Sequence, residues 1–251
     1  MKYRHIIFDA DHTIIDFQKD ERRALKEATL GIPPSKVRKL LSTAGIPPSD
    51  IPTLREQLAA HLQAYSLRNW TELGLDDVHE EAIQRRYHEL TYVHVHDLFA
   101  YAQKECALEN AEAAERIFFE TLCLPAHPME GALEVVKELS TRFSLSVATN
   151  GLAQMQRGRL KEFKPYLTHL FISEEMNTIK PAQEFGGIML ETLQAKAEEC
   201  LFVGDSLASD IALANRLGMD AVWYNPNGRP LPESVTLKGQ ITALNELFKY
   251  I

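Results

Sequence analysis

Helices and short apolar strands alternate along the second half of this chain, and this alternation restricts the fold more than any other feature. Apolar residues spaced three and four apart predict a helix over residues 131–143, and an apolar strand at 145–148 follows it directly. The same order recurs, with strands at 170–172, 201–203 and 221–224. Alternating helices and strands predict an α/β fold with a doubly wound parallel sheet.

A strand near the N-terminus is expected to join the same sheet. Residues 5–8 read His-Ile-Ile-Phe and can line a buried strand, but the next predicted strand begins only at residue 145. Between the two, residues 54–65, 81–92 and 110–122 repeat apolar side chains at helical spacing. We therefore expect an all-helical insertion in the sheet domain. The expected boundaries are residues 1–16 and 125–251 for the α/β core and residues 17–124 for the helical domain.

The composition limits the partners of this chain. Its 251 residues can form one large domain with an insert, and a formal net charge of -8 argues against unspecific binding to nucleic-acid polymers or anionic membranes. Cys106, Cys123 and Cys200 are odd in number and widely separated, which favours free thiols in a reducing compartment. The sequence shows neither a signal-peptide pattern nor a long apolar segment, so the cytoplasm is the expected location. The oligomeric state stays open.

Polar residues follow the predicted strands at four places along the chain. Asp9 and Asp11 come directly after the first strand, and alternate residues of an extended segment share a side, so both carboxylates can reach one bound group. Open α/β sheets bind ligands beyond the carboxyl ends of their strands, so we expect the four places to meet in one crevice. The other three places hold Thr149, Asn150 and Gly151; Lys180; and Asp205 with Asp210.

The four places together contain the groups that phosphoryl transfer requires. They supply a nucleophilic carboxylate, a second carboxyl for proton transfer, donors for phosphate oxygens, a fixed cation and acids for Mg²⁺. Taken singly, each residue has an ordinary structural interpretation, such as a helix cap, a turn residue or a solvated loop lysine. Their joint occurrence in this order favours catalysis.

These motifs resemble those of the haloacid dehalogenase (HAD) superfamily. The residues that carry the resemblance are Asp9-Ala10-Asp11, Thr149, Lys180, and Gly204-Asp205 through Asp210. The resemblance covers residues 1–16 and 125–251, and it implies a Rossmann-like core. The helical insertion lies where relatives with a type-1 cap have that domain, so the resemblance implies that residues 17–124 form a cap.

The resemblance also implies a role for each motif residue. Asp9 would attack phosphorus to give an aspartyl-phosphate, and Asp11 would protonate the leaving alkoxide and then activate the hydrolytic water. Thr149 and the amides of Asn150 and Gly151 would hold the phosphoryl group, and Lys180 would offset the clustered negative charge. The implied cofactor is Mg²⁺, held by the Asp9 carboxylate, the Asp11 backbone carbonyl, Asp205 and Asp210.

Asp11 narrows the choice among the reactions of the superfamily. An ester that leaves as an alkoxide needs a proton donor at this position, whereas carbon–halogen cleavage does not, so Asp11 argues against a dehalogenase or a phosphonatase. The expected activity is hydrolysis of a small phosphomonoester. A sugar-phosphate phosphatase and a phosphomutase also fit, and a non-catalytic protein that binds a phosphorylated metabolite is the alternative from another class.

Three further segments resemble the pyrimidine 5′-nucleotidase branch of the superfamily, which makes a pyrimidine nucleoside 5′-monophosphate the candidate substrate. The segments are residues 8–13, residues 172–175 before Lys180-Pro181, and residues 203–211. That branch usually has Glu where this chain has His12, which leaves the role of His12 open. His94 and His96 have the spacing of a metal site, but side chains two apart on a helix diverge, so we expect no zinc site there.

Overall fold

The computed structural model describes residues 2–43, 45–47, 51–233 and 235–251. The chain divides into two compact units. The first unit comprises Met1–Phe17, Val78–Arg85 and Pro125–Ile251, and the second comprises Gln18–Asp77 and Arg86–Leu124. Residues 78–85 thus belong to the α/β unit although they come from the middle of the helical insertion. Among the described residues, none of the helices combines the length and the apolar character that a membrane span requires.

The first unit is built on a six-stranded parallel sheet with the strand order β3-β2-β1-β4-β5-β6. The strands are β1 His5–Phe8, β2 Ser144–Thr149, β3 His169–Ile172, β4 Cys200–Gly204, β5 Asp220–Tyr224 and β6 Gly239–Ile241. β1 lies between β2 and β4, so the helical insertion separates two neighbouring strands. The predicted doubly wound parallel sheet is confirmed.

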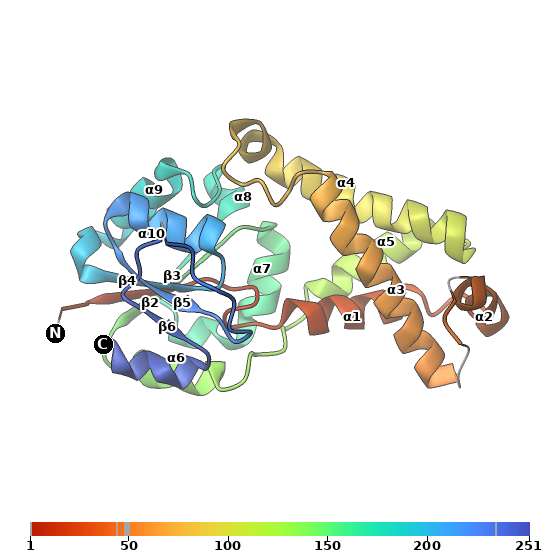
Figure 1. Ribbon diagram of the computed structural model, residues 1–251, viewed down its shortest axis with the longest axis horizontal. Coiled ribbons are helices and arrows are strands. Elements are labelled where there is room, and N and C mark those ends of the chain that lie inside the picture. The colour runs from red at the N-terminus through yellow and green to blue at the C-terminus, as the bar shows by residue number, and fades with distance from the viewer. Residues whose placement is uncertain (1, 44, 48–50, 234) are drawn as a thin grey trace. The chain divides into compact units, whose positions relative to one another are not determined.

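Helices cover both faces of this sheet, which is why its central strands are mostly apolar. Figure 1 shows α6 below the sheet and α9 and α10 above it. Val136 and Leu139 of α6 pack in one core with Ile6, whereas Phe185 and Met189 of α9 pack in the other with β1 and β4 residues. The helical segments of this unit are α6 Ala132–Leu139, α7 Ala153–Arg159, α8 Ser173–Met176, α9 Gln183–Leu193, α10 Ala212–Leu217, η1 Leu160–Glu162, η2 Lys164–Tyr166, η3 Ala197–Glu199, η4 Leu207–Ile211 and η5 Leu244–Lys249.

The predicted elements differ from the observed ones mainly where segments are short. The helix predicted over residues 211–217 is α10, and it ends at Gly218 with φ 73°, as a glycine stop does. A single π-helical turn, η4, precedes it and was not predicted. β6 and α8 were also missed, because three or four residues are too few to show a periodic pattern.

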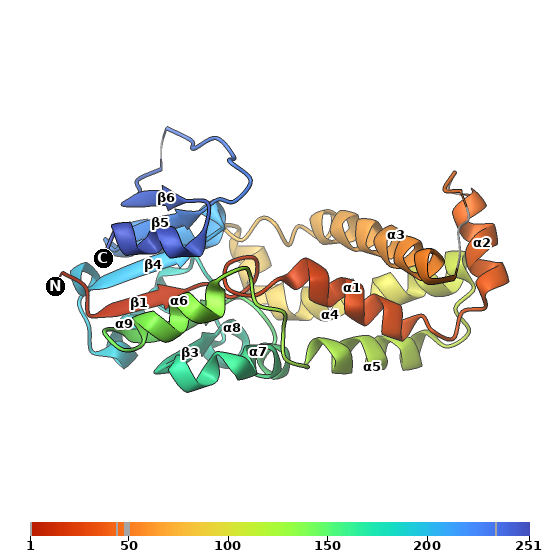
Figure 2. The ribbon, with the colours of Figure 1, turned by 90° about the horizontal axis from the view of Figure 1, so that it is seen from below.

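The second unit is all-helical, as expected for the insertion. Its helices are α1 Phe17–Ala28, α2 Pro34–Thr43, α3 Ile51–Glu72, α4 Glu81–Cys106 and α5 Ala111–Leu122, of which α1 and α4 begin within the first unit. Figure 2 shows α1, α3, α4 and α5 gathered into a bundle. Apolar and aromatic contacts join the helices, such as the edge-to-face pair Phe99 and Phe118 between α4 and α5.

The two histidines with metal-like spacing lie in this bundle and point in different directions. His94 is buried, with Nδ1 2.7 Å from Asn69 Oδ1 and Nε2 3.1 Å from Ser66 Oγ. His96 is exposed, and its Nδ1 lies 3.3 Å from Glu115 Oε2. Their partners are different polar groups on neighbouring helices. The two side chains thus diverge, as expected for positions two apart on a helix, and each ring has polar partners of its own.

Candidate active site

The turn after β1 places the predicted nucleophile inside the protein. Asp9 is 7% exposed, and its backbone N–H donates to Val203 O at 2.8 Å, which extends the pairing of β1 with β4 by one residue. The hydroxyl of the buried Thr13 lies 3.5 Å from Asp9 Oδ2. Ala10 O accepts from the amides of Ile14 and Ile15 at 2.9 and 3.0 Å, so the chain turns back at once beneath the carboxylate.

Lys180 is the buried cation of the site. Its Nζ donates to Asp9 Oδ1 at 2.6 Å, Asp210 Oδ1 at 2.7 Å and Ala148 O at 2.6 Å, so all three N–H groups of the ammonium have acceptors. The side chain of Asn150 holds the Lys180 backbone on both sides, accepting from its N–H at 2.8 Å and donating to its carbonyl at 2.9 Å. Asn150 thus fixes the loop that carries the cation.

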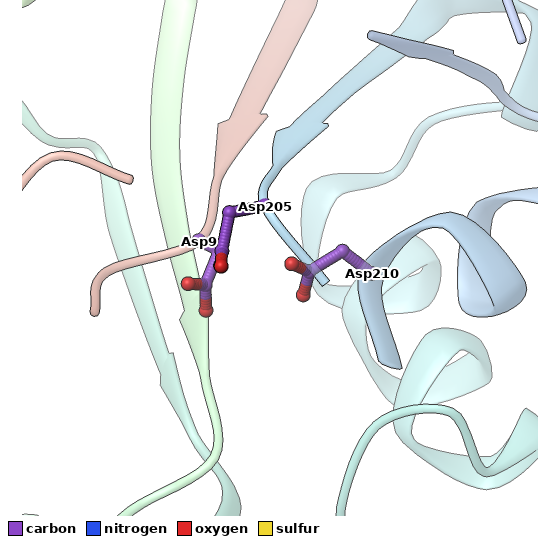
Figure 3. Close-up of side chains that lie close together, drawn as sticks. All are labelled: Asp9, Asp205 and Asp210. Carbon is purple, nitrogen blue, oxygen red and sulfur yellow. The ribbon is translucent and has the colours of Figure 1, made fainter. Parts of the chain in front are cut away.

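Three carboxylates meet at the carboxyl ends of β1 and β4. Each of Asp9, Asp205 and Asp210 offers a carboxylate oxygen, and these oxygens lie within 4.8 Å of one another. In Figure 3 the Asp9 and Asp205 side chains lie next to each other, and Asp210 faces them from η4. Asp210 is also held by Ser206, whose backbone N–H donates to its Oδ2 at 3.0 Å.

Carboxylates outnumber the cations that contact them in this cluster. Three carboxylates face one ammonium group, and only Lys180 contacts them directly as a cation within the described residues. Burial and the neighbouring Asp210 raise the pKa of Asp205 to about 7, and the same two causes raise the pKa of Asp9. A buried site in which every donor atom is a carboxylate oxygen matches what Mg²⁺ prefers. The residues present therefore fit a magnesium site formed by Asp9, Asp205 and Asp210.

Gly204 provides the space in which Asp210 approaches β4. A Cβ atom at position 204 would lie 2.3 Å from Asp210 Oδ2 and 2.5 Å from its Cγ. Asp210 cannot move away freely, because Lys180 and the Ser206 amide both hold its carboxylate. The glycine of this motif is thus required by the close approach of the Asp210 side chain.

We expect Gly204→Ala to destabilise the fold by about 1–3 kcal/mol, the usual cost of overpacking. By displacing Asp210, it should also weaken Mg²⁺ binding and so raise the Mg²⁺ concentration at the midpoint of activity. Thermal denaturation and the Mg²⁺ midpoint of activity would measure the two effects. Gly187→Ala on α9 is the matched control, since a Cβ there meets nothing within 4 Å. An unchanged Mg²⁺ midpoint in Gly204→Ala would contradict the assignment of Asp210 to the metal site.

Asp11 lies outside the acid cluster and has partners of its own. Arg159 Nη1 is 2.5 Å from Asp11 Oδ1, and Gln156 Nε2 donates to Asp11 Oδ2 at 2.7 Å. Gln156 Nε2 also donates to Thr149 Oγ1 at 3.0 Å, which links Asp11 to the predicted phosphate-binding hydroxyl. The two acids that share a strand end thus have different surroundings, one among carboxylates and the other beside a guanidinium group.

Comparisons with known proteins agree with this geometry. The profile of the hydrolase family described as haloacid dehalogenase-like hydrolase matches residues 3–218. The chain belongs to this HAD-like hydrolase family. The match spans the α/β unit through α10 together with the helical insertion, so it includes all four motifs.

The similar proteins include a nucleotidase, a HAD-hydrolase and a phosphatase. The pyrimidine 5′-nucleotidase PynA of Streptococcus pneumoniae is 30% identical over 231 residues, which are 90% of this chain and 86% of PynA. The HAD-hydrolase YfnB of Bacillus subtilis is 26% identical over 98% of this chain and 94% of YfnB. The magnesium-bound crystal structure of YfnB superposes with a TM-score of 0.71 at 27% identity, covering 99% of this chain and 98% of YfnB. The mouse N-acylneuraminate-9-phosphatase is 25% identical over 98% of this chain and 92% of its own length.

Some HAD motif residues also have protein contacts that the sequence did not suggest. The Gly151 N–H, predicted to bind phosphate, donates to Ser173 Oγ at 2.9 Å in this structure, so Ser173 of α8 holds this turn. The Thr149 hydroxyl and the Asn150 amide are the two other predicted phosphate ligands. His12 has φ 62°, and its ring lies edge-on to Phe17 with centroids 5.9 Å apart. It contributes to the turn rather than to the acid cluster.

Gln156 and Arg159 are the residues of this HAD site that the sequence reasoning missed. Both belong to α7, just after the Thr149-Asn150-Gly151 motif, and both are 1% exposed. A spacing of three places them on one face of the helix, next to the buried Met155 and Leu160. Two long polar side chains on the apolar face of a short helix were the signal that could have revealed them.

Proposed function

We propose that this protein is a Mg²⁺-dependent phosphatase that hydrolyses a small phosphomonoester through an aspartyl-phosphate intermediate. One observation carries the proposal: two carboxylates that follow the same strand have opposite surroundings. Asp9 lies in the acid cluster beside Lys180, and Asp11 lies beside Arg159 and Gln156. Titratable groups whose surroundings differ in this way take different catalytic roles.

In this reaction each residue acts through the contacts described above. Asp9 is the nucleophile: its carboxylate attacks phosphorus, the bond to the ester oxygen breaks, and Asp11 gives that oxygen a proton. Asp11 then removes a proton from the water that cleaves the aspartyl-phosphate, which restores both carboxyls. Lys180 offsets negative charge at the nucleophile, and the Thr149 hydroxyl donates to a phosphoryl oxygen. When bound by Asp9, Asp205 and Asp210, Mg²⁺ supplies positive charge that neutralises the phosphoryl oxygens and orients the phosphoryl group.

The proposed substrate is a nucleoside 5′-monophosphate, with a pyrimidine base as the first choice. This choice is supported by the identity to PynA, which covers most of both chains. Sugar phosphates are the second class to test, in view of the likeness to N-acylneuraminate-9-phosphatase. We propose that the helical unit acts as the cap that selects among them. Cys106 and Cys200 are buried free thiols, which suits the reducing cytoplasm that we propose as the location.

The test is a screen of phosphate esters with the purified full chain. We expect Mg²⁺-dependent phosphate release from nucleoside 5′-monophosphates, and we expect EDTA to abolish it and added Mg²⁺ to restore it. Chromatography of the products distinguishes a phosphatase, which gives free phosphate, from a phosphomutase, which returns the phosphoryl group to the substrate. Folded protein that releases no phosphate from any nucleotide or sugar phosphate would overturn the proposal.

A further inference from the structure

Helix α7 carries two buried polar side chains that the proposed reaction does not use. Gln156 and Arg159 are each 1% exposed, whereas Gln154 and Arg157 of the same helix are exposed. Burying an amide and a guanidinium group is costly unless each has polar partners. Their partners are Asp11 and Thr149, so the side chains of this helix that are turned inward reach the motif residues.

One hydrogen-bonded network joins four side chains: Arg159, Gln156, Asp11 and Thr149. The direction of each of these hydrogen bonds is fixed. Arg159 Nη1 donates to Gln156 Oε1 at 3.3 Å and lies 2.5 Å from Asp11 Oδ1. Gln156 Nε2 has two hydrogens, and they go to Asp11 Oδ2 at 2.7 Å and Thr149 Oγ1 at 3.0 Å. The opposite orientation of the amide would place its oxygen against the Asp11 carboxylate and its NH₂ group against the guanidinium. The surroundings therefore determine which way Gln156 faces.

This network constrains both Asp11 and Thr149. Each oxygen of Asp11 has a donor or a cation beside it, so the carboxyl group cannot rotate without losing one of the two contacts. Thr149 Oγ1 accepts from Gln156, which leaves the single hydroxyl hydrogen of Thr149 to point elsewhere. Because the Thr149 oxygen already accepts a hydrogen bond from Gln156, its hydrogen is available to donate to a phosphoryl oxygen.

The surrounding structure holds Gln156 and Arg159 in these positions. The guanidinium of Arg159 lies over the Phe17 ring, 5.0 Å from its centroid, which restricts the plane of the group. Gly151 leaves room for the amide, since a Cβ there would lie 2.8 Å from Gln156 Nε2.

Helix α8 in turn holds α7. Glu174 Oε2 accepts from the Ala153 amide at 2.7 Å, and Glu175 pairs with Arg157 at 2.5 and 2.7 Å. The first contact satisfies an amide at the beginning of α7, and the second joins the exposed sides of the two helices. The Glu174 contact therefore anchors the beginning of α7 independently of Gln156 and Arg159, whereas the exposed Arg157–Glu175 pair contributes little.

We propose that Gln156 and Arg159 are positioning residues, which aim the Asp11 carboxyl at the leaving oxygen and set the Thr149 hydroxyl to donate to the phosphoryl group. The proposal rests on the phosphatase function proposed above. Neither residue touches the reacting atoms; each acts through Asp11 or Thr149. Misplacing a catalytic group by about 1 Å can cost about 100-fold in rate, so the effect should be visible in kinetics.

The test compares kcat and KM of the full-length protein on p-nitrophenyl phosphate, whose leaving group needs no proton, and on glycerol phosphate, whose leaving group does. For Gln156→Met and Arg159→Met we expect kcat/KM on glycerol phosphate to fall about 10- to 100-fold, mainly through kcat. On p-nitrophenyl phosphate the fall should be several times smaller. Arg159→Lys, which keeps a cation, should recover part of the loss seen in Arg159→Met.

The chain offers matched controls on the same helix. Gln154→Met and Arg157→Met change the same residue types at exposed positions and should keep wild-type values for both esters, because exposed ion pairs contribute little. Equal losses on the two esters, or no loss in a folded variant, would overturn the positioning role. If Arg159→Met does not fold, the positioning role is tested with Gln156→Met and Arg159→Lys, by comparing the loss of kcat/KM on glycerol phosphate with the loss on p-nitrophenyl phosphate. A wild-type protein that hydrolyses neither these two esters nor any nucleotide or sugar phosphate would overturn the phosphatase function as well, so the two failures are distinguishable.

Discussion

Asp9→Asn is expected to lower the steady-state release of phosphate by about 10⁴-fold or more, because an amide cannot replace the carboxylate as nucleophile. The fold should be retained. Burial and Asp210 already raise the pKa of Asp9, so an uncharged group is tolerated at this position. Lys180 also keeps Asp210 and Ala148 O as acceptors. Phosphate release under saturating substrate and Mg²⁺ measures the loss, and thermal denaturation checks the fold.

Asp220→Asn is a suitable control for this experiment. Asp220 begins β5, at the end of the sheet opposite to the acid cluster, and its carboxylate pairs with Lys2 and Tyr3. Its substitution should leave turnover unchanged. Turnover by Asp9→Asn within about tenfold of the wild type would contradict covalent catalysis by Asp9. A wild-type protein that binds a phosphorylated metabolite without turning it over would favour the non-catalytic alternative.

Asp11→Asn is expected to lower kcat/KM on alkyl phosphates by about 10²- to 10⁴-fold, the usual contribution of a general acid. The loss on p-nitrophenyl phosphate should be at least about tenfold smaller, because p-nitrophenolate leaves without a proton. The quantity kcat/KM is the informative one, since it includes phosphoryl transfer to Asp9 but not the later hydrolysis of the intermediate. Equal losses on both esters would contradict the role of Asp11 as the acid.

The two acids at the end of β1 can be separated by their Mg²⁺ dependence. The Asp11 side chain is not one of the three that form the acid cluster. Asp11→Asn should therefore keep the Mg²⁺ midpoint of the wild type. Asp205→Asn should raise this midpoint and leave the ratio between alkyl and aryl esters unchanged, because it removes a metal ligand and not the proton donor.

Local sequence was sufficient to predict the sheet and the ends of its strands. Residues 6–8 and 201–203 are apolar because helices cover both faces of a parallel sheet, and each run is followed by an acid of the carboxylate cluster at the carboxyl end of the strand. The sequence also predicted that β1 joins the sheet although the insertion separates it from β2, whereas its place between β2 and β4 came from the structure. β6 and α8 were too short to leave a periodic pattern.

Only the tertiary structure decided how the motif residues divide into two groups. Asp9, Asp205 and Asp210 share a site with Lys180, whereas Asp11 turns to Arg159 and Gln156. Sequence spacing indicates that the Asp9 and Asp11 side chains can point to the same side of the chain. It does not indicate which donor each carboxylate oxygen accepts from. That depends on rotamers selected by neighbours from β2, β4, α7 and η4, which come together only when the sheet has formed. The physical reason is that hydrogen bonds and ion pairs act over a few ångströms in space, while the residues that form them are far apart in the sequence.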